Sequence, residues 1–221
     1  MGDKYKRGDH RALKSGEAVV LIHGLWMPGG AMMPLAHRLR RGGWATAIFS
    51  YAARYVTVKQ NAAALAAFAN KVDASQVHFV AHSLGGLVLS QCLLDFPVQR
   101  PGRVVLLGTP YRGSYVARRL NQYRLGRWLC GLSLQQALLG DGPRWPGGRE
   151  LGVIAGTTPF GAGRLIPGLP RPNDGTVAVA ETQVPGQTDT ITLPVTHSGM
   201  LFSAMVARQV AAFLADGRFS R

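Results

Sequence analysis

Short apolar runs alternate along the chain with longer segments of helical periodicity, and this alternation limits the folds open to it more than any other feature. The runs are nearly continuous in apolar residues, which is typical of strands buried on both faces of a parallel sheet. They are Ala18–His23, Trp44–Ser50, Gln76–Ala81, Arg103–Gly108, Glu150–Gly156 and Thr188–Pro194. We therefore predict an α/β fold with one doubly wound, mostly parallel sheet of about six strands and helices on both faces.

The segments between these runs carry apolar residues at helical spacing. The predicted helices are the stripe Met32–Leu39, which Gly42 ends, then Thr57–Val72, Ser83–Asp95 and Ser198–Ala215. Residues 114–140 also have a helical pattern and form a helical insert after the fourth run. Apolar side chains surround most of Ser83–Asp95, so this helix is expected to be buried.

With 221 residues, 47% of them hydrophobic, the chain suffices for one core, and we predict a single domain over residues 1–221. Residues 1–16 form a basic N-terminal extension without the apolar stretch of a secretory signal. No run of 18 apolar residues occurs, so a soluble, cytoplasmic protein is expected. Cys92 and Cys130 are expected to be buried free thiols, and no cysteine or histidine pair has metal-ligand spacing.

The formal net charge of +14 and the pI near 10.9 indicate attraction to something anionic, such as a membrane surface or nucleic acid. The arginines cluster within predicted helices, at 38–41 and 118–127, where a solvated helix face is the simpler explanation and the one we prefer. No nucleic-acid-reading motif occurs, and aromatic residues are not interleaved with the charges. We therefore predict no specific nucleic-acid partner, and the oligomeric state stays open.

The stretch FVAHSLGG places Ser83 directly after the third apolar run and at the start of a buried helix. A serine on a sharp strand-to-helix turn needs small neighbours, which Ala81, Gly85 and Gly86 supply. The glycines match neither of the phosphate-binding patterns GxGxxG and GxxxxGK, so a nucleotide site is not expected. The remaining alternative is a serine that only caps the helix.

A serine hydroxyl needs a base to remove its proton and an acid to orient that base. His197 follows the last predicted strand, at the same edge of the sheet as Ser83, and is our candidate base; Ser198 could cap the next helix and fix its loop. The other histidines are expected to have structural or solvated positions: His10, His23, His37, His78 and His82. Of these, His82 is expected to point away from the serine, and His23 to fix its own loop by a hydrogen bond.

Two aspartates compete as the orienting acid. Asp174 lies in RPNDGTV, at the expected sheet edge, and Asp141 follows the helical insert. A reaction at a carbonyl also needs donors for the oxyanion. We choose the N–H groups of Leu25, after the first strand, and Leu84, after the serine.

Together, VLIHGLW, AHSLGG, LGTPYRGS, NDGTV and THSGML resemble the α/β-hydrolase superfamily, and within it the small bacterial lipases and esterases. The order Ser83, Asp174, His197 is the order of that superfamily, and we choose Asp174 on this ground. The resemblance implies hydrolysis of a carboxylic ester through an acyl-enzyme, without metal or cofactor. A thioesterase or an acyltransferase would use the same residues. A non-catalytic basic module that binds anionic membrane or nucleic acid is a further alternative.

The substrate is expected to be a small acyl ester. Trp26, Met27 and Tyr111 are the residues expected to line its pocket. Residues 114–140 are open to two interpretations: a mobile lid, whose basic face contacts an anionic membrane surface, or a docked helix with a solvated basic face.

Overall fold

The structure is a computed structural model, and it describes residues 16–53, 55–124, 126, 143–161 and 166–221. Its sheet contains six parallel strands in the order β2-β1-β3-β4-β5-β6, which confirms the predicted sheet. The strands are β1 (Glu17–Ile22), β2 (Ala45–Phe49), β3 (Gln76–His82), β4 (Val104–Leu107), β5 (Leu151–Gly156) and β6 (Asp189–Leu193). Every one begins and ends within two residues of its prediction.

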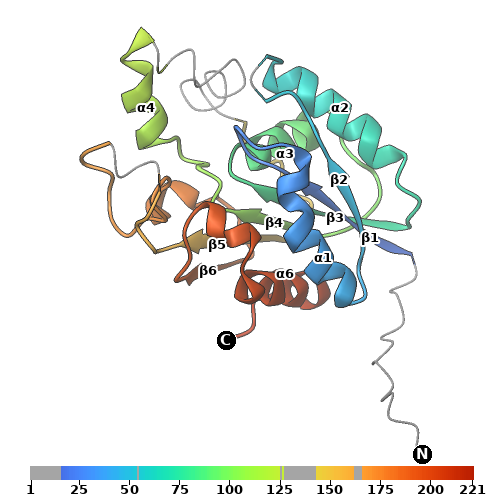
Figure 1. Cartoon of the computed structure of the whole chain (residues 1–221). Helices are drawn as coiled ribbons and strands as arrows, with labels where there is room; N and C mark the ends of the chain where they lie inside the picture. The colour runs from blue at the N-terminus through green and yellow to red at the C-terminus, as the bar shows by residue number, and fades with distance from the viewer. Residues whose placement is uncertain (1–15, 54, 125, 127–142, 162–165) are drawn as a thin grey trace, which may run out of the picture.

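Helices cover both faces of this sheet. Helices α2 (Val58–Asn70) and α3 (Leu84–Asp95) lie together on one face, and α1 (Met33–Arg41) and α6 (Ala204–Asp216) lie on the other (Figure 1). A short helix, α4 (Tyr115–Asn121), projects beyond the sheet in Figure 1. In the described part of the chain, no helix has the length and apolar character needed to cross a lipid bilayer.

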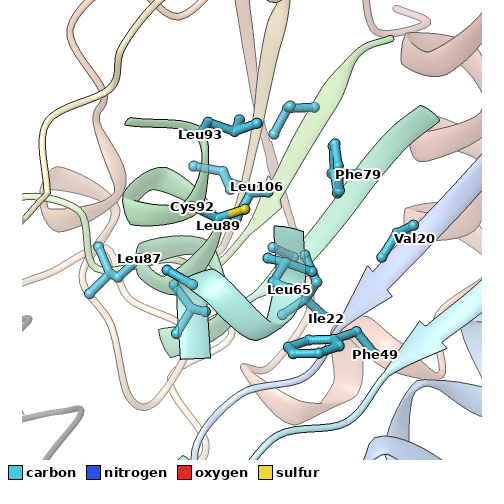
Figure 2. Packing of buried hydrophobic residues seen from close by; sticks show 14 of the residues in the cluster. Val20, Ile22, Phe49, Leu65, Phe79, Leu87, Leu89, Cys92, Leu93 and Leu106 are labelled. Carbon is cyan, nitrogen blue, oxygen red and sulfur yellow. The ribbon is translucent and has the colours of Figure 1, made fainter. Parts of the chain in front are cut away.

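Two apolar cores, one on each face of the sheet, follow from this arrangement. Figure 2 shows the core between the sheet and α2–α3, where side chains of all three elements meet. Cys92 lies in it beside Leu89 and Leu106, and burial raises the pKa of its thiol to about 12. The prediction of a buried free thiol is confirmed for Cys92, whereas Cys130 lies outside the described residues.

The predicted helix from Ser198 to Ala215 is interrupted. A 3-10 turn, η4 (Ser198–Leu201), comes first, and α6 starts at Ala204 after Ser203, whose hydroxyl accepts a hydrogen bond from Val206 N. Ser198 makes no capping hydrogen bond, so its expected role is wrong. Thr196 takes it instead, because its hydroxyl accepts from Gly199 N at 3.1 Å. This turn belongs to the loop that carries His197.

Part of the large positive charge serves the fold. Arg100 donates to the carbonyl groups of Ala69, Val72 and Ala74 at the end of α2, and Arg103 donates to those of Leu214 and Ala215 at the end of α6. Cations near helix C-termini also interact favourably with the helix dipole. These two arginines therefore need no external anionic partner to explain them.

Arg149 is the most connected of these arginines. It donates to the carbonyl oxygens of Val77 at 2.9 Å and Gly102 at 3.0 Å, and also to those of Val98 and Arg100. Its guanidinium carbon lies 5.3 Å from the centre of the Phe79 ring. The planar guanidinium group of Arg149 thus joins β3 to the loop that leads into β4.

We expect Arg149→Lys to destabilise the protein by about 2 kcal/mol, because an ammonium group cannot reach four carbonyl groups at once. Urea unfolding followed by circular dichroism measures the change. Arg218→Lys, at an exposed position, is the matched control and should change stability by less than about 0.5 kcal/mol. Equal effects of the two substitutions would contradict the structural role of Arg149.

Candidate functional site

A pocket of about 550 Å³ lies where the carboxyl ends of the central strands meet the following loops. In open α/β sheets ligands bind at this edge. Most of its lining is apolar, and the polar groups come from four segments that are distant in the sequence. The lining residues are Leu25, Trp26, Met27, His82, Ser83, Leu84, Pro110, Ser114, Ala117, Phe160, Gly161, Thr176, Val177, Thr196, His197 and Ser198.

Ser83 occupies a strained turn between β3 and α3. Its φ of 54° and ψ of −126° lie in a region that a non-glycine residue adopts at a cost of about 1–3 kcal/mol. The turn is tight because α3 starts against the segments that follow β1 and β4: a Cβ on Gly85 would lie 2.4 Å from His23 O, and one on Gly86 would lie 2.2 Å from Thr109 Oγ1. Ser83 makes no side-chain capping bond to its helix, so the structure does not support a purely capping role.

His197 and Asp174 form a buried pair beside this turn. His197 Nδ1 and Asp174 Oδ2 are 2.7 Å apart, and the two residues are 8% and 1% exposed. The other carboxylate oxygen of Asp174 accepts hydrogen bonds from Thr176 N at 2.9 Å and Val177 N at 2.7 Å. These bonds hold the carboxylate in one orientation toward the imidazole.

Ser83 and His197 line the same pocket. Among the hydrogen bonds of the described residues, none joins the two side chains. Such contacts are often long in a site without substrate and tighten when a substrate is bound. The structure thus brings the three sequence-predicted residues to one place, with the acid and the base in direct contact.

His82 departs from its expectation. It lines the pocket instead of pointing away, and its ring lies 4.6 Å from the ring of His197, centre to centre. Its Nε2 is 3.0 Å from the carbonyl oxygen of His197. No pattern in the sequence indicates this contact, because the two residues are neighbours only in the folded chain.

The loop after β1 is fixed by His23, as expected. His23 Nε2 accepts a hydrogen bond from Tyr51 N at 3.2 Å, so Nδ1 carries the ring proton and donates it to Gly24 O at 2.8 Å. Tyr51 also stacks on the ring, with centroids 4.4 Å apart, and donates its hydroxyl to His23 O. Since the C=O and N–H of a trans peptide point in opposite directions, the Leu25 N–H points away from the His23 ring.

This loop also lies against the serine turn. A Cβ on Gly24 would lie 3.0 Å from the Cβ of Ser83, so only glycine fits here without displacement. In the described part of the chain, neither Leu25 N nor Leu84 N has a hydrogen-bond acceptor. Both N–H groups belong to residues that line the pocket.

Tyr111 is not among the pocket-lining residues, which corrects its expected position. It lies in a turn after β4 and packs against the core on the α2–α3 face, while the preceding Pro110 reaches the pocket. Trp26 and Met27 do line the pocket, and Trp26 is 56% exposed.

The predicted insert 114–140 is described only at its start. Ser114 caps α4 by accepting from Ala117 N at 3.1 Å, and both residues line the pocket. The buried carboxylate of Glu181 accepts from Tyr115 N and anchors this first turn, and burial raises the pKa of Glu181. Residues 127–142, which include most of the insert and Asp141, lie outside the described part of the chain.

Within the described residues, no group of three or more histidine, cysteine and acidic side chains has an arrangement that could hold a metal ion. The polar groups of the pocket are suited to moving a proton. A buried carboxylate beside an imidazole, next to a hydroxyl on a strained turn, is such an arrangement.

Comparison with known proteins agrees with this architecture. The mature lipase BlEst2 of Bacillus licheniformis has a similar structure, with a TM-score of 0.75 and 19% identity over 93% of this chain and 94% of that one. In the propeptide form of that lipase the match spans 52% of the longer chain. A metagenomic carboxyl esterase matches with a TM-score of 0.62 and 19% identity over 89% and 69% of the two chains.

At these identities the likeness shows the fold alone. A search of curated proteins finds no match. The sequence profile of the alpha/beta hydrolase family, however, matches residues 19–217, which is most of the chain. With its six-stranded parallel sheet and its pocket at the carboxyl edge, the chain therefore belongs to the alpha/beta hydrolase family.

Proposed function

We propose that this protein is a serine hydrolase that cleaves carboxylic esters through an acyl-enzyme, with Ser83, His197 and Asp174 as its catalytic triad. The observation that carries the proposal is the 2.7 Å contact between Asp174 Oδ2 and His197 Nδ1, beside a serine held at a φ of 54° in the same pocket. Similar structures named as a lipase and a carboxyl esterase support the ester as the substrate class.

The buried carboxylate sets the tautomer of the base. Asp174 Oδ2 only accepts, so His197 carries its ring proton on Nδ1 and leaves the Nε2 lone pair free for the Ser83 proton. As the hydroxyl oxygen attacks the ester carbon, the proton moves to Nε2. The resulting imidazolium is stabilised by the adjacent carboxylate.

The N–H groups of Leu25 and Leu84 stabilise the oxyanion of the tetrahedral intermediate. Leu84 is the first residue of α3, so its N–H is one of the groups left without a partner inside the helix. The peptide before Leu25 is held by the His23 bond to Gly24 O. Both donors are thus fixed before substrate arrives, which makes them more effective than mobile donors.

The reaction then proceeds in two halves. When the tetrahedral intermediate collapses, the ester C–O bond breaks, and the alcohol leaves with the proton from His197 Nε2. Water next attacks the acyl-Ser83 carbonyl and gives a proton to the same nitrogen. The acid is released, and Ser83 recovers its hydrogen.

The acyl group is expected to lie along the apolar part of the pocket, against Met27, Ala117 and Val177. Apolar lining with few polar groups is typical of a site that binds the hydrocarbon part of a ligand. The exposed rings of Trp26 and Phe160 extend this surface to the pocket mouth. Contact with an anionic membrane surface stays a separate prediction.

Hydrolysis of p-nitrophenyl esters from acetyl to palmitoyl, compared with matching thioesters, tests this function. We expect ester turnover, together with labelling by a fluorophosphonate that peptide mapping places on Ser83. Faster turnover of the thioester with the same label would favour a thioesterase. Absence of hydrolysis and label, or a label on another serine, would contradict the proposal.

A further inference from the structure

His82 is a buried titratable residue that the proposed chemistry leaves without a role. It is the last residue of β3, directly before Ser83, and is 1% exposed. Its Nε2 lies 3.0 Å from the backbone oxygen of His197. Because a carbonyl oxygen only accepts, Nε2 carries the proton and donates it. The residue next to the nucleophile thus holds the backbone of the base.

The surroundings of the ring keep it in this state. Nδ1 is buried and has no hydrogen-bond partner among the described residues, and a Cβ on Gly24 would lie 3.0 Å from it. A second ring proton would therefore be a buried donor without an acceptor. Burial, with the nearby His197 ring as a smaller cause, lowers the pKa of His82 to about 3. His82 is neutral wherever an esterase works and keeps its proton on Nε2.

Three hydrogen bonds fix His197. Its N–H donates to Asp174 O at 2.9 Å, its ring contacts the Asp174 carboxylate, and its carbonyl oxygen accepts from His82. The first two connect the base to the acid. Of the hydrogen bonds among described residues, only the third connects His197 to the strand end and turn that carry Ser83.

We propose that His82 is a positioning residue that sets the distance between the His197 imidazole and the Ser83 hydroxyl. The inference rests on the proposed function and assigns a further residue to the same site. The acid loop and the serine turn come from different strands, so the separation of base and nucleophile needs a direct connection. A misplacement of about 1 Å at such a site costs about a hundredfold in rate.

Three variants separate this role from simple packing. In His82→Gln the amide nitrogen reaches about as far as Nε2, so the bond to His197 can form again. In His82→Asn the side chain is shorter, so its amide group lies near the position of Nδ1 and cannot reach the His197 carbonyl oxygen. His82→Phe fills the space of the ring but has no hydrogen-bond donor. We expect kcat within about tenfold of the wild type for the Gln variant and about a hundredfold lower for the Asn and Phe variants, with KM nearly unchanged.

Titration with a fluorophosphonate distinguishes a slow site from a missing one. If a substitution unfolds part of the protein, a smaller fraction of the molecules is labelled. If it only misplaces the base, every molecule is labelled in the end, but the rate constant of labelling is lower. Two results would overturn the role of His82: equal kcat values for the Gln and Asn variants, or a lower fraction of labelled molecules with an unchanged labelling rate. If wild-type Ser83 is not labelled, the proposed function fails; if it is labelled and His82→Phe reacts at the wild-type rate, only the positioning role fails.

Discussion

Replacing Ser83 with alanine is expected to lower kcat for esters by about 10⁶-fold, the loss that follows removal of the nucleophile in a serine protease. Without the hydroxyl no acyl-enzyme can form. The measurement is ester turnover at high enzyme concentration, together with fluorophosphonate labelling. Both should disappear in the variant.

The fold should survive this substitution. The Ser83 side chain makes no helix-capping bond, and the backbone bonds of Ser83 N to Leu107 O and of Gly86 N to Ser83 O remain in an alanine variant. Ser90→Ala, which removes another hydroxyl from α3, is the matched control and should keep most of the activity. A Ser83→Ala protein that is folded and still hydrolyses esters would show that another residue is the nucleophile.

The sheet could be predicted almost completely from the sequence. A parallel strand buried on both faces is a nearly continuous apolar run, and Arg103–Gly108 and Glu150–Gly156 differ from β4 and β5 by one residue at most ends. The break between η4 and α6 was not predicted, because Ser198 and Ser203 are both serines that could cap a helix in that segment. Which serine caps depends on backbone angles that periodicity does not reveal.

The site was predictable where its chemistry follows from local sequence. Ser83 could be found because a small-residue turn after a strand is a local pattern. The chain order on which we choose Asp174 fits Asp141 as well, since both aspartates lie between Ser83 and His197; the contact with His197 Nδ1 is the observation that supports Asp174. The role of His82 was missed because it depends on the meeting of two loops 115 residues apart.

Tyr111 shows where prediction from sequence position fails: it was expected to line the pocket and does not. It lies within two residues of Thr109 and Pro110, at the sheet edge where a pocket was expected, yet it is half-buried and packs against the core on the α2–α3 face. The Tyr111 N–H bond to Thr109 O belongs to a sharp turn that brings Pro110 to the pocket. Sequence position indicates the edge of the sheet but not the direction of a side chain within a turn.

Asp174→Asn is expected to lower kcat by about 10⁴-fold, and the hydrogen bonds of the site give the reason. Two backbone N–H groups, from Thr176 and Val177, point at Oδ1. In the variant the amide oxygen is the group that can accept from them, so the NH₂ group takes the place of Oδ2 and faces His197. His197 Nδ1 must then accept, and its proton moves to Nε2, where it opposes the Ser83 hydroxyl.

Asp174→Asn distinguishes a loss of activity caused by the wrong tautomer of His197 from a loss caused by unfolding. Because the amide oxygen keeps both backbone bonds, thermal stability should stay close to that of the wild type, and the loss should appear in kcat with little change in KM. Asp141→Asn, at the competing aspartate, should leave kcat within about twofold, since it keeps the contact between Asp174 and His197. If Asp141→Asn instead abolishes turnover while Asp174→Asn preserves it, the 2.7 Å pair is not the one that sets the tautomer of the base.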